Sequence, residues 1–268
     1  MHRFIWWLIM IIGAGLIGLI AWNALQPPEP SLPVAPPAPR LEPPPLTRPA
    51  EPEIRHPVPD QLPEKPLPAL DTSDSTMQGS IPGLSADQGL SGALILQDFV
   101  RRVVATIDNL PGPKVATRVL PVKRVDGVFI VSGEEGNYTI AADNAARYGK
   151  YVKLAEAVDT GKLAAFYFHY YPLFQQAYRE LGYPKGHFND RLVAVIDHLL
   201  EAPESKAPVA LVRPKVLYLY ADPELEARSA GQKMLMRMGA EHAGRVKAKL
   251  REIRAAIANR STAAAGGK

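Results

Sequence analysis

An apolar run near the N-terminus, followed directly by a proline-dense stretch, constrains this chain more than any other feature. Residues 4–25 contain no charged side chain, and about 20 apolar residues are enough for a helix to cross the hydrocarbon core of a bilayer. Trp6, Trp7 and Trp22 lie near the two ends of the run, where indole rings favour the membrane interface. The pattern predicts a single transmembrane helix over residues 4–25.

The positive charges near this run predict its orientation. Arg3 lies on the short side, and the next Lys or Arg in the chain is Arg40. The positive-inside rule therefore places residues 1–3 in the cytoplasm and the rest of the chain in the periplasm, as a single-pass protein of the inner membrane. A cleaved signal peptide is the alternative, but its apolar region is usually shorter and ends in a small-x-small site, which is poorly matched here.

The stretch after the apolar run is dominated by proline. Residues 26–68 hold 17 of the 27 prolines, and proline excludes helix and pushes the residue before it toward extended geometry. Large apolar residues are sparse, so burial cannot offset the entropy lost on ordering. We predict a disordered proline-rich linker over residues 26–89, which serves as a spacer. The alternative is a docking site for proline-binding modules.

Charge and cysteine content distinguish the rest of the chain, predicted as one folded domain over residues 90–259 with a disordered tail at 260–268. From residue 90 onward the chain has 26 Lys and Arg and 18 Asp and Glu, a net charge of +8, whereas residues 26–89 have a net charge of −5. A basic domain suits an anionic lipid surface or an acidic polymer, or its charge serves solubility alone. The predicted compartment argues against nucleic acid. Disulfides and thiol chemistry are excluded because cysteine is absent.

Periodicity and turn residues predict an α+β, mainly helical domain, in which about six helices pack a β-hairpin and short strands. Asp159 or Thr160 can cap the best-defined helix, and Gly182 and Pro184 follow its end. The helices are expected over residues 91–109, 142–148, 150–157, 160–181, 189–201, 227–239 and 241–258. The strands are expected over residues 125–131, 138–140, 209–212 and 215–220.

Candidate catalytic residues are few. Glu134 and Glu135 lie between two glycines in the predicted hairpin turn, where a carboxylate can act as a general acid or base, although adjacent glutamates in a turn are usually solvated. Asp190 is a third candidate acid or base. With His187 it offers two metal ligands, but no third ligand is visible, so no metal site is predicted. We prefer the interpretation that His187, Asn189 and Asp190 cap the helix after Gly186.

Aromatic side chains supply the candidate binding residues. Tyr167 and Tyr171 belong to an aromatic cluster over residues 166–178, which could stack on the sugar rings of a cell-wall polymer, with His187 nearby. An aromatic stripe at helical spacing is more often part of a core. The chain has no phosphate-binding glycine loop, no G-x-S-x-G and no H-E-x-x-H, and Ser229 has no evident base near it in sequence. No cofactor is predicted.

The predicted span, linker and domain favour a protein that positions a binding domain in the cell envelope over one that catalyses a reaction. We expect a non-enzymatic binding or assembly module in the cell envelope, which meets an envelope protein or a wall polymer at a set height above the inner membrane. The alternative is an envelope hydrolase or transferase that acts on peptidoglycan through Glu134, Glu135 or Asp190.

Six short stretches of the predicted domain form a pattern: LPVKR at 120–124, GEEGNY at 133–138, YPLFQQAY at 171–178, LGYP at 181–184, FNDR at 188–191 and RPKVLY at 213–218. Together they resemble an uncharacterised bacterial family, catalogued as domain of unknown function three thousand and fourteen. The resemblance covers about residues 95–257. It implies a Gram-negative protein with an N-terminal anchor, and it implies no activity and no catalytic residue.

Overall fold

The computed structural model describes residues 53–59, 66–204 and 208–258. Contacts divide the chain into residues 1–50 and 51–268, so every described residue belongs to the second unit. None of the helices in these ranges is long and apolar enough to span a bilayer. The predicted span at 4–25 and the predicted tail at 260–268 lie outside the described residues.

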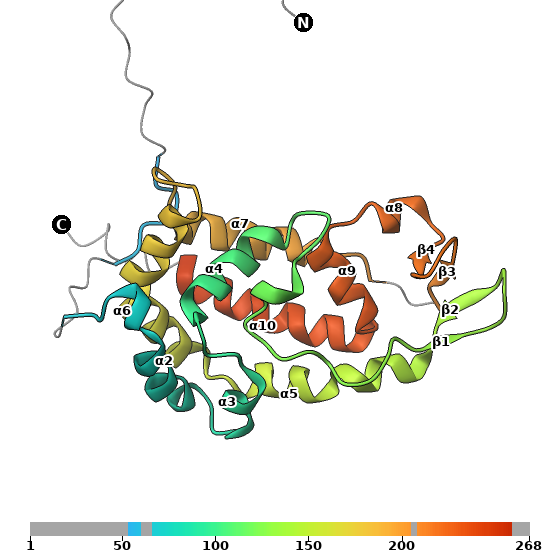
Figure 1. Ribbon diagram of the computed structural model, residues 1–268, viewed down its shortest axis with the longest axis horizontal. Helices are drawn as coiled ribbons and strands as arrows, with labels where there is room; N and C mark the ends of the chain where they lie inside the picture. Colours follow the sequence, from blue (N-terminus) through green and yellow to red (C-terminus); the bar gives the residue numbers. More distant parts are fainter. Residues whose placement is uncertain (1–52, 60–65, 205–207, 259–268) are drawn as a thin grey trace, which may run out of the picture. The chain divides into compact units, whose positions relative to one another are not determined.

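The described part is mainly helical, with one small antiparallel sheet, which confirms the α+β class (Figure 1). Its helices are η1 (Leu70–Thr72), α2 (Asp74–Ser80), η2 (Ile81–Leu84), α3 (Gly89–Ala93), α4 (Phe99–Asn109), η3 (Thr117–Val119), η4 (Ala142–Tyr148), α5 (Gly149–Ala157), α6 (Thr160–Glu180), α7 (Phe188–Leu200), α8 (Pro223–Glu226), α9 (Ala230–Arg237) and α10 (Ala240–Ala258). Its strands are β1 (Val131–Ser132), β2 (Tyr138–Ile140), β3 (Ala210–Val212) and β4 (Leu219–Tyr220).

The folded part begins earlier than predicted, so the expected boundary at residue 90 is wrong. Within the predicted linker, η1, α2 and η2 place Leu70, Met77, Ile81 and Leu84 in the main hydrophobic core. Few apolar residues occur there, but Met77, Ile81 and Leu84 recur at helical spacing and so share one face. The Ser80 hydroxyl also lies 2.9 Å from the Tyr170 hydroxyl of α6. This segment is part of the domain because its few apolar side chains all find core partners.

The helix expected over residues 91–109 is two helices, α3 and α4, with an extended connection between them. Asp98 adopts a left-handed backbone conformation just before α4, and its own side chain makes no capping bond. The carboxylate of Asp74 instead accepts hydrogen bonds from the backbone N–H groups of Asp98, at 2.7 Å, and Phe99, at 3.1 Å. A cap supplied from α2 therefore fixes where α4 begins.

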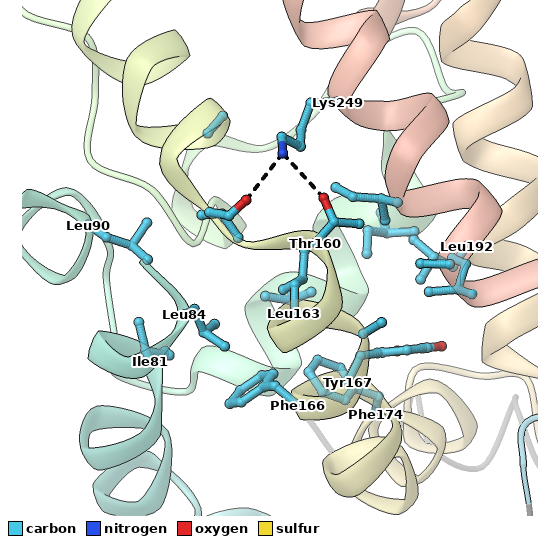
Figure 2. A pocket seen from close by; sticks show the side chains of 18 of the residues that line it. Ile81, Leu84, Leu90, Thr160, Leu163, Phe166, Tyr167, Phe174, Leu192 and Lys249 are labelled. Carbon is cyan, nitrogen blue, oxygen red and sulfur yellow. Dashed lines mark hydrogen bonds between the residues drawn. The ribbon is translucent and has the colours of Figure 1, made fainter. Parts of the chain in front are cut away.

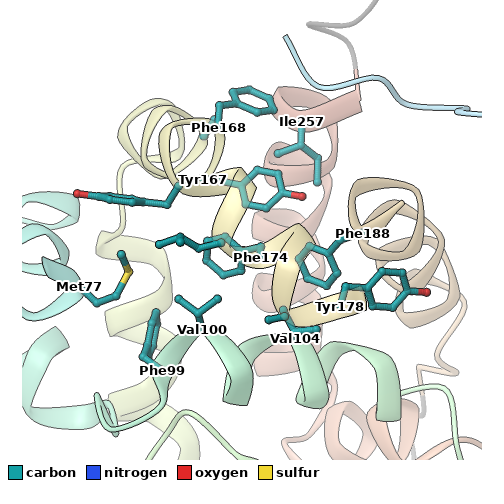
Figure 3. Packing of buried hydrophobic residues seen from close by; sticks show 14 of the residues in the cluster. Met77, Phe99, Val100, Val104, Tyr167, Phe168, Phe174, Tyr178, Phe188 and Ile257 are labelled. Atoms are coloured by element: carbon teal, nitrogen blue, oxygen red, sulfur yellow. The ribbon is translucent and has the colours of Figure 1, made fainter. Parts of the chain in front are cut away.

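Helix α6 is the centre of the core. It begins as predicted, because the Asp159 carboxylate accepts a hydrogen bond from the Lys162 N–H at 2.8 Å. Its aromatic side chains pack between α4 and α7, and the Phe174 ring stacks on Phe188 with centroids 6.0 Å apart (Figure 3). Each large side chain buried in this way stabilises the fold by roughly 1.5–3 kcal/mol.

The sheet lies at the opposite end of the domain from α2, α3 and α6 (Figure 1). Its strand order is β1-β2-β3-β4, and every neighbouring pair is antiparallel. The first and last strands are shorter than predicted, since β1 starts only at Val131 and β4 only at Leu219. Leu211, Tyr220 and Met236 form a separate small core under the sheet.

Candidate functional site

Asp190 holds a segment from the predicted linker against the start of α7. Its Oδ1 accepts a hydrogen bond from the His56 N–H at 2.7 Å, and its Oδ2 accepts one from the Arg55 N–H at 3.1 Å. The neighbouring Asn189 donates from Nδ2 to the His56 carbonyl at 2.8 Å. A carboxylate whose two oxygens are both engaged by backbone donors is committed to structure, so Asp190 is not placed as a general acid or base.

The other predicted residues near α7 also serve structure. The buried Tyr167 hydroxyl donates to Asn189 Oδ1 at 3.1 Å, and the Tyr171 hydroxyl donates to Gln175 Oε1 at 2.8 Å. Burial, and then the charge of Tyr171 and Asp190, raises the pKa of the Tyr167 phenol well above its ordinary value. Burial likewise raises the pKa of Tyr171. Tyr167 is therefore a core residue, and only Tyr171 keeps part of its ring at the surface.

The expected cap of α7 is wrong. His187 occupies the capping position but makes no side-chain capping bond, and Asn189 and Asp190 are engaged with residues 55 and 56 instead. Gln175 of α6 supplies the cap: its Oε1 accepts from the Phe188 N–H at 2.9 Å, and its Nε2 donates to the Gly186 carbonyl at 2.8 Å. A buried amide from another helix replaces the local cap because both donor and acceptor are then satisfied.

Glu134 and Glu135 lie on the exposed turn between β1 and β2, at the sheet end of the domain (Figure 1). The turn closes with a hydrogen bond from the Asn137 N–H to the Glu134 carbonyl at 2.9 Å. Gly133 has a φ of 95°, and a Cβ there would lie 2.1 Å from the Asn137 carbonyl oxygen. The turn thus requires glycine for its geometry, and the two glutamates do not join Asp190, Tyr167 or Tyr171 in one site.

The structure brings a histidine to Ser229, which the sequence did not indicate. His198 Nε2 lies 2.8 Å from Ser229 Oγ, which suits a base and a nucleophile. However, Ser229 is buried, and its Oγ accepts the Gln232 N–H at 3.2 Å as the cap of α9. Gln232 in turn donates to the His198 carbonyl at 2.9 Å. These contacts tie α9 to α7 and engage the buried hydroxyl in structure.

A cavity of about 340 Å³ lies between α4, α6, α7 and α10, with η2 and α3 along one side (Figure 2). That volume is at the small end of the range for ligand sites, roughly 300–1,000 Å³. Its walls are almost wholly apolar, and several lining side chains stay half-buried. The apolar walls include Ile81, Leu84, Leu90, Leu94, Val103, Ile107, Leu163, Phe166, Leu192 and Ile253.

One end of the cavity carries a cation. The Lys249 side chain of α10 reaches toward the first residue of α6 (Figure 2). Its Nζ donates to Thr160 Oγ1 and to the Val158 carbonyl, both at 3.2 Å, and to Glu252 Oε2 at 2.8 Å. Thr160 also donates to Glu252 Oε2 at 3.0 Å. The hydrogen bond from Lys249 to the Glu252 carboxyl, and after it the one from Thr160, hold the pKa of that carboxyl below its usual value.

The chemistry of the lining is narrow. Of the described residues in the lining, only Thr160, Tyr167 and Lys249 have polar side-chain groups, and the Tyr167 hydroxyl is committed to Asn189. No group of three or more His, Asp or Glu side chains in the described ranges is placed to hold a metal ion. Sequence reasoning missed this cavity because its walls come from many helices. The one local signal was the polar start of α6.

Comparisons with known proteins identify a family but no activity. The family described as "Protein of unknown function (DUF3014)" matches residues 99–254. That range contains α4, α6 and α7 and most of α10, which are the four helices around the cavity. No curated protein and no solved structure matches the chain. The match covers more than half of the chain, so the protein belongs to the DUF3014 family.

Proposed function

We propose that this protein is a single-pass inner-membrane protein whose periplasmic domain binds a small apolar ligand without chemical turnover. The cavity between α4, α6, α7 and α10 is the observation that carries this proposal. Half-buried apolar walls are unfavourable in water, and contiguous apolar surface in a concave site is typical of ligand binding. The uncharged residues 4–25 support the membrane location.

The lining supports binding over catalysis. General acid–base chemistry needs a titratable group within hydrogen-bond reach of a substrate. Among the described residues that line the cavity, Lys249 and the buried phenol of Tyr167 are the only ionisable groups. The carboxylates proposed from the sequence are placed elsewhere, in an exposed turn and in the contacts to residues 55 and 56.

The alternative proposals are an envelope hydrolase or transferase acting on peptidoglycan and a purely structural assembly factor. Turnover of wall fragments by the full chain would support the hydrolase, and its loss in Glu134→Gln would place the reaction at the turn. In-cell crosslinking that captures an envelope protein, with no ligand in the cavity, would support the assembly factor.

The binding proposal is tested with the full chain in lipid nanodiscs and a photoreactive long-chain alcohol. We expect mass spectrometry to locate the label on peptides of α4, α6 and α10. Ala256→Leu should reduce the labelling several-fold, because Ala256 lines the cavity and the larger side chain fills it.

Ala255→Leu is the matched control, since Ala255 is exposed on the same helix. It should leave labelling unchanged. Thermal unfolding of both variants shows whether lost labelling reflects lost folding. Label spread evenly over the domain, or equal labelling of the two variants, would contradict the proposal.

A further inference from the structure

The cavity has a polar end as well as apolar walls, and the two together specify a ligand class. Resting on the proposed binding function, we infer that the cavity takes one alkyl chain that ends in an anionic headgroup, with the headgroup held by Lys249 and Thr160. The inference combines the size of the cavity, the single cation at its end and the way that cation is held.

The size and lining determine the chain. A volume of about 340 Å³ is near the lower limit for ligand sites, roughly 300 Å³, so it suits one chain better than two. Most of the wall consists of aliphatic and aromatic side chains, which offer no hydrogen bond to a sugar or a peptide. An unbranched apolar chain loses no hydrogen bond when it is buried in such surroundings, because it has no polar group.

The cation determines the headgroup. The Lys249 side chain is only 14% exposed, and its ammonium is the sole charged group among the lining residues. Two of its three hydrogen bonds are long, at 3.2 Å to the Thr160 hydroxyl and the Val158 carbonyl. An anionic oxygen at this point would gain a charge-assisted hydrogen bond, which is stronger than a bond to a neutral acceptor.

Glu252 shows that the position accepts an anion. Its carboxylate bonds to both Lys249 Nζ and the Thr160 hydroxyl, while its side chain is 55% exposed. An anionic headgroup can take the same two donors, and Glu252 can then turn into water with little loss, because exposed ion pairs contribute little to stability. The headgroup would compete with the Glu252 carboxylate for the same two donors, so removal of that carboxylate should strengthen binding of the headgroup.

The start of α6 favours the same charge. Thr160 is the first residue of this helix of 21 residues, and the positive end of a helix dipole attracts anions, although the Asp159 cap already offsets part of it. A cationic headgroup would be repelled by the Lys249 ammonium. A neutral headgroup would gain only the weaker hydrogen bond of a neutral acceptor.

The test uses the full chain in lipid nanodiscs with photoreactive alkyl probes of one chain length. The probes differ only in the headgroup: carboxylate, phosphate, alcohol or quaternary ammonium. Labelled peptides are located by mass spectrometry, and apparent affinities come from competition with unlabelled probe. We expect the anionic probes to bind roughly tenfold more tightly than the alcohol, and the ammonium probe more weakly than the alcohol.

Substitutions at the end of the cavity should act with opposite signs. Lys249→Met keeps the apolar stem and should remove the preference for anionic probes while alcohol labelling stays. Glu252→Gln removes the competing carboxylate and should strengthen anionic binding about twofold to fivefold. Arg251→Met removes a charge at an exposed position of the same helix and should change neither. If Lys249→Met fails to fold, the exposed Glu252→Gln still decides the question.

The outcomes separate the two proposals. Equal labelling by all headgroups, or no response to Lys249→Met and Glu252→Gln, overturns the headgroup inference and leaves the binding function standing. Absence of labelling in the cavity by every probe overturns the binding function itself. Tighter binding of the carboxylate identifies a fatty acid, and tighter binding of the phosphate identifies a single-chain phospholipid; both support the inference.

Discussion

Two regions of the domain use α6 in opposite ways. Along one face, Tyr167, Tyr171 and Gln175 join a polar network with the start of α7 and residues 55 and 56. Along the other, Leu163 and Phe166 face the apolar cavity. In the network, each of the polar groups named has a partner from the chain itself. In the cavity, several of the apolar lining side chains remain half-buried.

The difference separates structural residues from binding residues. Conspicuous side chains such as Asp190 and the tyrosines are engaged within the fold, because a buried polar group without a partner is costly. Around the cavity, several less conspicuous apolar side chains stay half-buried, and Lys249 shares its hydrogen bonds with the exposed Glu252. A residue type suited to chemistry is therefore a poorer guide here than the identity of its partners.

The largest expected effect is in the polar network, at Gln175. Gln175→Leu should lower the free energy of unfolding by about 3 kcal/mol, since the Phe188 N–H and the Gly186 carbonyl lose their partner. Gln176→Leu is the matched control at an exposed position of the same helix, and it should cost less than about 0.5 kcal/mol. Chemical denaturation of the full chain measures both. Similar costs would show that the network does not carry stability.

The next effect concerns the docked segment. Asp190→Ala should lower stability by about 2 kcal/mol, because two backbone donors lose a charged acceptor. Hydrogen exchange should then accelerate at the His56 amide and remain slow in α6. Asp143→Ala, at an exposed position of η4, is the control. Unchanged protection of His56 would mean that Asp190 does not hold this segment.

Alkaline pH should affect Tyr167, which belongs to both regions. Its folded-state pKa lies well above the ordinary value of 10.0, mainly through burial. Above about pH 10 the unfolded chain therefore releases this proton while the folded chain keeps it, and stability falls as pH rises. The slope is about 1.4 kcal/mol per pH unit for one such group. Tyr167→Phe should reduce the slope by that amount, and an unchanged slope would refute the assignment.

The smallest effect is expected at the sheet turn. Glu134→Gln and Glu135→Gln should each change stability by less than about 0.5 kcal/mol, because both side chains are exposed. Neither should alter labelling of the cavity by an alkyl probe. A marked effect of either substitution on binding would move the functional site away from the α6 cavity.

Local signals predicted the elements that depend on local contacts. The start of α6 was predictable because its cap is Asp159, three residues before the amide that it accepts. The break between α3 and α4 was not, because Asp74 supplies the cap from 24 residues away. Distant contacts also decide the candidate site. The sequence predicted Asp190 as a candidate acid or base, but its hydrogen-bond partners are 134 and 135 residues away, and no local pattern indicates contacts of that kind.

The docking of residues 53–59 onto α7 also changes the mechanics of the protein. If the predicted span ends at residue 25, the proposed spacer covers residues 26–52, which would reach about 80 Å as a polyproline II helix. A pull on the anchor would load the Asp190 contacts first. Their rupture would release residues 53–57 and add roughly 15 Å of reach, because Val58 and Leu67 still pack against the main core. Force spectroscopy would record this release as a first, small extension step before the domain unfolds. Under the proposed membrane anchoring, the tether would then have two lengths, and the Asp190 contacts would determine which one operates.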